Sequence, residues 1–344
     1  MKAIKFFAIT AMAAAMITSC STDDELSQSN YPSDNIIRVT AGVNNAKTRA
    51  DGAGTEMKND FSLTIVNKNT EKPELASKYS YTDKVFSKKS GDWACSETLL
   101  WQDSKTPVDI VAFAPAQEGK FNGVYDEGNT QPIQSIAYSV ADDQSTKSDN
   151  NDLLYYYAKD FKPGDKLVDK KLSIQFNHAF CMIDINVTLG TEFNKPKVLD
   201  DSPIVKVTLG GTKIEANVDV TNAASVVTAS GEAADITTTK GDFTKAENAD
   251  KKADPEVNAI SRFSCIAIPQ TVAANTFKVS LMTAGKRYEW TSDKEITLQS
   301  GYRYTLNLTM GNDVVLLKGG SGSDNGGISA TPWGPGTGGS LETE

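Results

Sequence analysis

Apolar and polar side chains alternate with a period of two along most of the chain. Phe61, Leu63 and Ile65 form one such series, and the even-numbered residues from 302 to 310 form another, with polar side chains between them. Successive side chains of a strand point to opposite faces of a sheet, so this pattern predicts strands with one buried face. A helical pattern is convincing only in the apolar run at the N-terminus. The chain is therefore predicted to be all-β.

The predicted strands fall into two groups. The first lies within residues 36–161, with strands centred near these positions: Val39, Leu63, Tyr79, Leu99, Val111, Tyr138 and Tyr156. Lys-Pro-Gly-Asp at residues 162–165 interrupts the pattern, and a second group runs from Leu172 toward the C-terminus. Antiparallel sheets with one solvent-exposed face stack in pairs, so that their apolar faces are buried against each other. We therefore predict two tandem antiparallel β-sandwich domains, at residues 36–164 and 165–318, followed by a Gly-rich hinge and tail at residues 319–344.

Turn signals inside the second group predict its hairpins. Gly210 and Gly211 separate two alternating runs, and Gly285 and Lys286 separate two more. Tight hairpin turns need a positive φ, which glycine adopts without steric penalty, so both sites are predicted to be hairpin turns. Residues 230–258 are rich in Asp, Glu, Lys and Ala and have no sustained apolar period. We expect a mobile surface loop there.

The N-terminus has the pattern of an export signal. Lys2 and Lys5 precede an apolar stretch of about a dozen residues, shorter than the roughly 20 that a membrane-spanning helix needs. Thr18, Ser19 and Cys20 end the stretch. Small residues followed by cysteine are typical of a bacterial lipobox, in which the thiol receives lipid and becomes the new N-terminus. Residues 1–19 are therefore predicted to be a lipoprotein signal peptide, and an ordinary secretory leader with an incidental cysteine is the alternative.

The same pattern predicts a location. Acyl chains on Cys20, each contributing about 0.8 kcal/mol per buried CH₂, would anchor the protein to the outer membrane of a Gram-negative cell. Residues 20–35 are polar and are predicted to be a flexible tether. The whole chain has 35 basic and 44 acidic side chains and a formal net charge of -9. This balance argues against a nucleic-acid partner and against adsorption to anionic membrane without the lipid.

Few residues offer chemistry. Besides Cys20 the cysteines are Cys95, Cys181 and Cys265, an odd number with no C-x-x-C pair. Neither a disulfide framework nor a zinc site is expected, and a single bridge among the three stays open. His178 is the only histidine, and no G-x-S-x-G motif exists. We predict no enzymatic activity, no catalytic residue, no metal and no cofactor.

The apolar phase switches around His178. Even-numbered positions are apolar up to Phe180, and odd-numbered positions are apolar from Cys181 onward. Such a switch predicts a β-bulge or a segment buried on both faces, with His178 as a hydrogen-bonded filler. The acidic run from Asp142 to Asp152 lacks the glycine of an EF-hand calcium loop, so it is interpreted as a solvated loop.

Aromatic side chains leave a binding function open. The candidates for stacking on sugar rings are Tyr155, Tyr156, Tyr157, Trp93 and Trp101. About half of the aromatic residues in an alternating strand face the core, so packing is the competing interpretation. A non-polymerising surface lipoprotein that binds glycans or host ligands is therefore one functional hypothesis.

Five short motifs occur in order along the chain: the lipobox at Cys20, Lys-Thr-Arg-Ala at 47–50, Phe-Asn-His-Ala at 176–179, Gly-Tyr-Arg-Tyr at 301–304 and Ile-Ser-Ala-Thr-Pro-Trp at 328–333. Together they resemble the motifs of the fimbrillin family, the pilin-like lipoproteins of type V pili in Gram-negative anaerobes. Acidic residues at 23–25 also resemble the surface-export signal of lipoproteins in these bacteria.

The resemblance implies transthyretin-like sandwich domains and a subunit that assembles with other fimbrial subunits. Proteolysis between Arg49 and Ala50 would free the strand near Val39 and leave an unpaired sheet edge above an apolar groove. A neighbouring subunit's tail would fill the groove by strand addition. The donor candidates are apolar residues of the tail: Val314, Val315, Leu316, Leu317, Ile328 and Trp333.

The resemblance leaves the mode of assembly open. Arg49 is either the maturation site or a surface arginine in a linker. The tail either leaves its subunit or folds back on its own C-terminal domain. Cleavage would separate the subunit from its lipid, as in a stalk subunit, whereas an uncleaved chain would stay anchored. Stalk, anchor and tip roles all remain compatible with the sequence.

Overall fold

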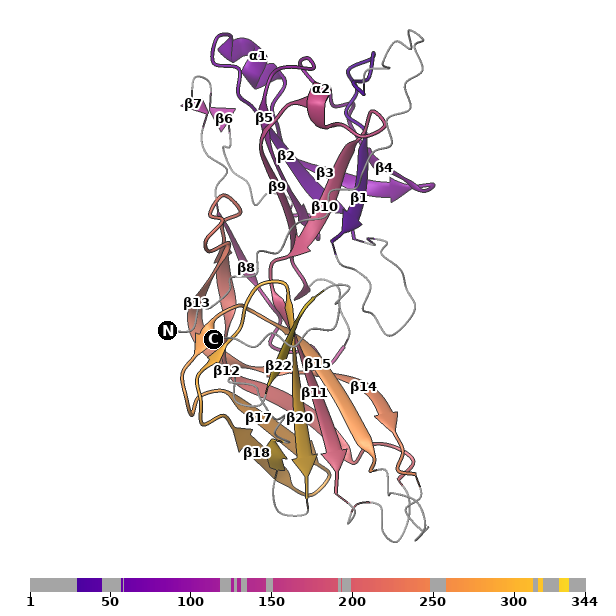
Figure 1. Cartoon of the computed structure of the whole chain (residues 1–344), viewed down its shortest axis with the longest axis vertical. Helices are drawn as coiled ribbons and strands as arrows, with labels where there is room; N and C mark the ends of the chain where they lie inside the picture. The colour runs from indigo at the N-terminus through magenta and orange to yellow at the C-terminus, as the bar shows by residue number, and fades with distance from the viewer. Residues whose placement is uncertain are drawn as a thin grey trace, which may run out of the picture.

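A computed structural model describes residues 30–44, 57, 59–117, 125–126, 129–130, 135–146, 151–190, 193, 199–247, 258–311, 315–317 and 328–333. Figure 1 shows a barrel stacked end to end on a two-sheet sandwich. Most described residues lie in strands, so the all-β prediction is confirmed. The two described α-helices are short, α1 (Pro73–Lys78) and α2 (Pro163–Lys166). In this part of the chain no helix is long and apolar enough to cross a membrane.

The first unit is a closed barrel. Its strands follow the order β1-β10-β9-β5-β2-β3-β4 around the barrel. Their bounds are β1 (Val39–Val43), β2 (Phe61–Asn67), β3 (Tyr81–Lys89), β4 (Asp92–Cys95), β5 (Val108–Ala114), β9 (Leu154–Phe161) and β10 (Leu172–His178). Every residue of β2 is buried, because Phe61, Leu63 and Ile65 face the barrel core while Val66 joins a second apolar cluster outside it.

The second unit is a sandwich of two sheets. One sheet contains β14 (Thr239–Thr244), β15 (Ile260–Ala267), β11 (Cys181–Leu189), β20 (Tyr302–Met310), β21 (Val315–Leu317) and β22 (Ser329–Pro332). The other contains β13 (Val227–Thr237), β12 (Ile204–Val218), β17 (Lys278–Thr283), β18 (Arg287–Thr291) and β8 (Ile136–Ser139). Two small ladders complete the described strands: β6 (Tyr125–Asp126) with β7 (Asn129–Thr130), and β16 (Thr271–Val272) with β19 (Ile296–Thr297).

The sheets divide the chain at a different point from the predicted boundary near Gly164. The Pro-Gly turn there forms α2, after which β10 returns to the barrel and pairs with β1 and β9. The chain visits the sandwich first with β8, returns to the barrel with β9 and β10, and passes finally into the sandwich at Ala179 and Phe180, between β10 and β11. The phase switch at His178 therefore marks a crossing from one sheet to another. Of the two predicted structures the bulge was wrong, whereas the consecutive burial of Ala179, Phe180 and Cys181 fits a segment buried on both faces. An apolar pattern records which side of a strand is buried but not which sheet buries it.

The predicted hairpin at Gly210 and Gly211 was also wrong, whereas the one at Gly285 and Lys286 is confirmed by the pairing of β17 with β18. β12 continues through both glycines, and its register with β13 shifts between Leu209 and Thr212. Gly211 has φ +86, so the Gly-Gly pair makes a bulge in one long strand rather than a reversal. On the N-terminal side of the bulge β12 pairs with β17, and on the C-terminal side it pairs with β8.

Part of the polar insertion at residues 230–258 is regular structure. Residues up to 237 continue β13, and β14 follows directly. The expectation of a loop was therefore wrong for residues 230–237 and 239–244, while residues 248–257 lie outside the described chain. β13 and β14 lie at sheet edges and are mostly exposed. Such strands gain main-chain hydrogen bonds without the apolar alternation that reveals a half-buried strand.

An apolar cluster connects the two units. Val66, Val111 and Phe113 of the barrel belong to the same contiguous cluster as Ile136 of β8 and Val218 of β12. Figure 1 shows β8 and β13 rising from the sandwich beside the barrel. Burial of apolar surface contributes about 25 cal/mol per Å², so this shared cluster fixes one unit against the other better than a polar linker would.

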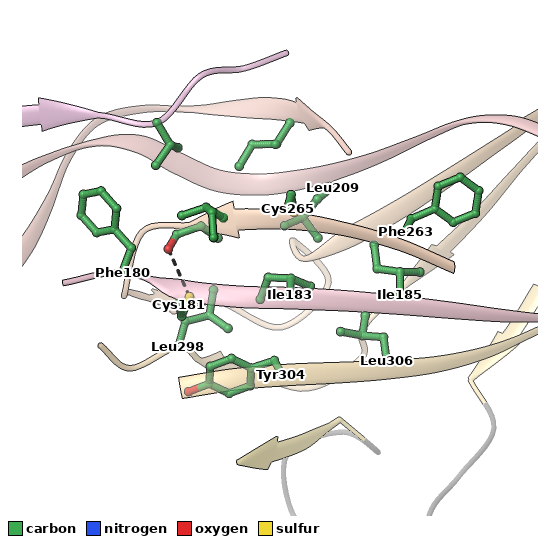
Figure 2. Packing of buried hydrophobic residues seen from close by; sticks show 14 of the residues in the cluster. Phe180, Cys181, Ile183, Ile185, Leu209, Phe263, Cys265, Leu298, Tyr304 and Leu306 are labelled. Atoms are coloured by element: carbon green, nitrogen blue, oxygen red, sulfur yellow. Dashed lines mark hydrogen bonds between the residues drawn. The ribbon is translucent and has the colours of Figure 1, made fainter. Parts of the chain in front are cut away.

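The sandwich core is built by the alternation that the sequence displays. In β11 each odd-numbered position from Cys181 to Leu189 is buried, and Figure 2 shows Cys181, Ile183 and Ile185 facing the opposite sheet beside Tyr304 and Leu306. The thiol of Cys181 donates to the carbonyl oxygen of Ala267 over 3.2 Å. Burial raises the pKa of the Cys181 and Cys265 thiols. Cys95, Cys181 and Cys265 are all free cysteines, so no bridge forms among them.

Candidate functional site

β1 closes the barrel. It runs parallel to β10 over five residue pairs, from Val39 opposite Leu172 to Val43 opposite Phe176. On its other side it pairs with β4 only at Val39, which lies opposite Trp93. Val39 is 4% exposed, and Ala41 and Val43 pack against the barrel core. β1 is therefore held tightly to β10 and weakly to β4, and the barrel has a seam along β4.

Hydrogen bonds beyond both ends of β1 extend its attachment. The main-chain N–H of Ile37 donates to the carbonyl oxygen of Leu99 over 2.9 Å, ahead of the strand. At the other end, the N–H of Asn44 donates to Phe176 O over 2.7 Å, and its side-chain amide reaches Asn177 Oδ1 over 2.9 Å. Removing the segment from Ile37 to Asn44 would leave Leu99 O, the two acceptors on β10 and an apolar trough without these partners.

The trough under β1 is lined by aromatic rings. Phe61 stacks on Phe86 with ring centroids 5.2 Å apart and meets Trp93 and Phe176 edge-on at 5.0 and 5.5 Å. Trp93 and Phe176 lie opposite the first and last residues of β1. Aromatic pairs in such geometries contribute about 0.5–1.5 kcal/mol beyond their buried area. The rings give the site an apolar floor that suits small aliphatic side chains.

The C-terminal tail lies on its own sandwich. β22 pairs antiparallel with β20 from Tyr302 opposite Pro332 to Thr305 opposite Ser329, and β21 pairs with the far end of β20. Both use the edge of β20 that β11 leaves free. Ile328 is 1% exposed and Val315 is 6% exposed, so both are anchored in the sandwich core. The described parts of the tail therefore fold back on their own C-terminal domain, one of the two arrangements that the sequence left open.

His178 holds the end of the tail at the junction of the two units. The Trp333 indole stacks on the imidazole with ring centroids 3.8 Å apart and an interplanar angle of 9°. The other support of the ring is Asp152, whose Oδ2 lies 2.9 Å from His178 Nδ1. The side chains of His178 and Asp152 are 10% and 12% exposed. Next to them, burial raises the pKa of Tyr138 to about 12, and the Asp152 carboxylate adds to the rise.

The structure places some predicted site residues and leaves others outside its described part. Cys20, Arg49, Ala50 and Val314 lie outside the described residues, as does the predicted signal peptide. Leu316 and Leu317 lie in β21, whereas Ile328 and Trp333 flank β22. Sequence reasoning found β1 and the tail as separate segments. Sequence reasoning missed Asp152, which was assigned to a solvated loop. The only local sign of its role is that Asp152 lies two residues before β9, which begins at Leu154.

The aromatic candidates for sugar stacking have packing roles. Trp101 is 2% exposed and stacks on Phe161, and Tyr155, Tyr156 and Tyr157 pack against the two apolar clusters. Among the described residues, the large hydrophobic side chains that are exposed are Val168, Val205 and Met282. The described part of the chain also holds no cluster of three or more His, Cys, Asp or Glu side chains suited to a metal ion.

The contact between Trp333 and His178 gives a direct prediction. Replacing Trp333 by alanine removes the stack, so we expect the amide hydrogens of β22 to exchange with solvent roughly tenfold faster, as a loss of about 1.4 kcal/mol implies. Hydrogen exchange followed by mass spectrometry of residues 328–333 measures this. Thr331→Ala, an exposed change on the same strand, is the control. Equal exchange in both variants would show that the stack does not hold the tail.

The fold and the site define an all-β protein of two units, in which an N-terminal strand completes a barrel and a C-terminal tail covers a sheet edge. The chain belongs to the fimbrillin-like family, whose family model matches residues 48–333. The comparison with curated proteins gives no match.

Solved structures share this fold. A candidate cell adhesion protein from Bacteroides ovatus is 16% identical with a TM-score of 0.53, covering 82% of this chain and 95% of its own. A second candidate cell adhesion protein, from Bacteroides uniformis, is 12% identical with a TM-score of 0.53 over 88% of this chain and 99% of its own. A fimbrial protein from Bacteroides vulgatus is 13% identical with a TM-score of 0.50 over 87% of this chain and 99% of its own.

Proposed function

We propose that this protein is a structural subunit of a cell-surface fimbria that matures by cleavage after Arg49 and assembles by donor-strand exchange. The observation that carries the proposal is the position of β1 inside the barrel, between β10 and β4. Family membership supports a fimbrial role and association with other fimbrial subunits. Arg49 follows β1 by a few residues, so a cut there separates β1 from the rest of the barrel in sequence.

The energetics favour a lasting joint between subunits. β1 presents Val39, Ala41 and Val43 to the barrel core. An apolar side chain seated in the groove contributes about 1.5–3 kcal/mol and each ladder hydrogen bond about 0.5–1.5 kcal/mol net. A donor strand that restores these contacts supplies on the order of 10 kcal/mol before the entropy of ordering the tail is deducted.

The proposed location follows from the leader and the family. Lipid on Cys20 holds the precursor at the outer membrane, and the mature subunit is held in the fimbria by its neighbours. The proposed role needs no catalysis. One face of the His178 ring is covered by Trp333 and its Nδ1 faces Asp152, an arrangement suited to holding the tail.

An arginine-specific protease tests the proposal on the purified full-length chain. We expect one dominant cut between Arg49 and Ala50, followed by ladders on a gel that resist detergent until the sample is heated. Mass spectrometry identifies the cut, and the gel measures the assembly.

Two arginine variants complete the test. Arg49→Ala is expected to lower ladder formation more than tenfold, because β1 stays covalently attached. Arg287→Ala removes another exposed arginine and should leave both the cut and the ladders unchanged. A cut after Arg49 that yields only monomers would contradict assembly by strand exchange.

A further inference from the structure

The strand that closes the barrel and the last strand of the tail share a side-chain pattern. Residues 39–43 read Val-Thr-Ala-Gly-Val, and residues 328–332 read Ile-Ser-Ala-Thr-Pro. Each segment begins with a buried β-branched residue, Val39 or Ile328, continues with an exposed hydroxyl residue, and places a half-buried alanine third. A strand fits a groove when its side chains on one face match the seats in that groove. The tail segment therefore carries a close copy of the face by which β1 fills the barrel.

The tail segment, including its proline, can also make the main-chain hydrogen bonds that β1 makes to β10. Leu172 donates to Arg38 O over 2.8 Å, and Asn44 donates to Phe176 O over 2.7 Å. Main-chain groups alternate sides along a strand, so the even-numbered residues of β1 bond to β10 and the N–H of Val43 points to the other side. On that side β4 pairs with β1 only at Val39. A proline in the place of Val43 therefore sacrifices no hydrogen bond to β10, which is the position at which a strand tolerates proline.

We propose that residues 328–332 of a second copy of this chain replace β1 in the same direction and the same register. Ile328 then lies opposite Leu172, Ala330 opposite Ile174 and Pro332 opposite Phe176. Trp333 takes the place of Asn44, and its main-chain N–H donates to Phe176 O. This inference rests on the proposed function, because it specifies which part of the tail is the donor and how it lies in the groove.

The register divides the tail into two parts with different roles. Residues 328–333 match the whole length of β1 and the residue after it. β21 offers only Val315, Leu316 and Leu317, a continuous apolar run rather than an alternating one. A continuous run suits a strand covered on both faces, whereas the outward positions of β1 are a threonine and a glycine. β21 is thus the poorer match to the groove.

Disulfide trapping between two chains tests the register. Gln175 and Thr331 are both exposed, and the register places Thr331 of one chain opposite Gln175 of another. In a background with Cys20→Ser and Cys95→Ser, one protein carries Gln175→Cys and the other Thr331→Cys. The two are mixed, treated with the arginine-specific protease and mildly oxidised. Because each chain has one introduced cysteine, a disulfide between residues 175 and 331 must join different chains.

In an equal mixture, about a quarter of the joints bring a Thr331→Cys tail to a Gln175→Cys groove. We expect more than half of these joints to contain the disulfide between residues 175 and 331, identified by mass spectrometry of the linked peptides. Without protease the link should fall at least tenfold. Ser329→Cys mixed with Gln175→Cys is the matched control, because a strand inserted in the opposite direction about Ala330 would place Ser329 opposite Gln175.

The outcomes separate this inference from the proposed function. Ladders that carry the link from residue 329, or neither link, would overturn the register and leave strand exchange itself standing. Ladders linked from residue 331 would support both. Failure to form ladders after a complete cut at Arg49 would overturn the proposed function and this inference with it.

Discussion

Replacement of Gly211 by alanine is expected to lower the free energy of unfolding by more than about 3 kcal/mol. Two physical effects combine at this position. Gly211 has φ +86, a conformation in which a residue with a Cβ loses about 1–2 kcal/mol. A Cβ built there would also lie 2.1 Å from the carbonyl oxygen of Thr276, a main-chain atom that cannot rotate away. β12 or the segment before β17 must therefore move, which disturbs the centre of one sheet.

Two other glycines separate these effects. A Cβ on Gly91 meets nothing within 4 Å, but the residue has φ +99, so Gly91→Ala tests the backbone conformation alone. Gly285 also has open space around it and no positive φ, so Gly285→Ala should be nearly neutral. Denaturant titration of the three variants measures the order. If Gly211→Ala lowers the free energy of unfolding by an amount within about 1 kcal/mol of that for Gly91→Ala, the close approach to Thr276 does not contribute to the loss of stability.

The sequence was informative wherever one face of a strand is buried by its own sheet. β11 and β20 alternate cleanly, and the residues predicted to face inward, such as Ile183 and Leu306, are fully buried. Local patterns were ambiguous at Gly210 and Gly211, because a bulge and a hairpin turn both use the positive φ that glycine permits. Apolar and polar residues alternate both before and after these two glycines, and this pattern is expected for a bulge as well as for a hairpin turn. Only the pairing of the whole of β12 with β13 decides between the two.

The closure of the barrel could not be predicted from local pattern. β1 and β10 are far apart in sequence and pair in parallel, so no turn between them marks the contact. The same holds for Trp333 and His178, where a tail residue meets the end of β10. The sequence therefore identified the two segments that make the candidate site, one at each end of the chain. Only the resemblance to the fimbrillin family placed the strand near Val39 over an apolar groove, and nothing in the sequence showed that Asp152 and His178 hold the tail.

Phe61→Ala is expected to destabilise the barrel by about 3–5 kcal/mol, the range for removing a fully buried phenylalanine. Phe61 is fully buried and contacts Phe86, Trp93 and Phe176. The last two lie opposite the ends of β1, so the cavity opens directly beneath that strand. We expect β1 and β10 to show the largest increase in hydrogen exchange, and the precursor to release residues 1–49 faster after cleavage at Arg49.

Phe277→Ala is the matched control, because Phe277 is equally buried but lies in the sandwich and meets Trp290 edge-on at 6.4 Å. It should cause a loss of stability of similar size and raise exchange in β17 and β18 while β1 changes little. Hydrogen exchange of the two variants side by side distinguishes a local effect of the aromatic floor from general destabilisation. If both variants raise exchange in β1 equally, the apolar cluster that joins barrel and sandwich makes the two units open together, and β1 cannot leave without loosening the sandwich.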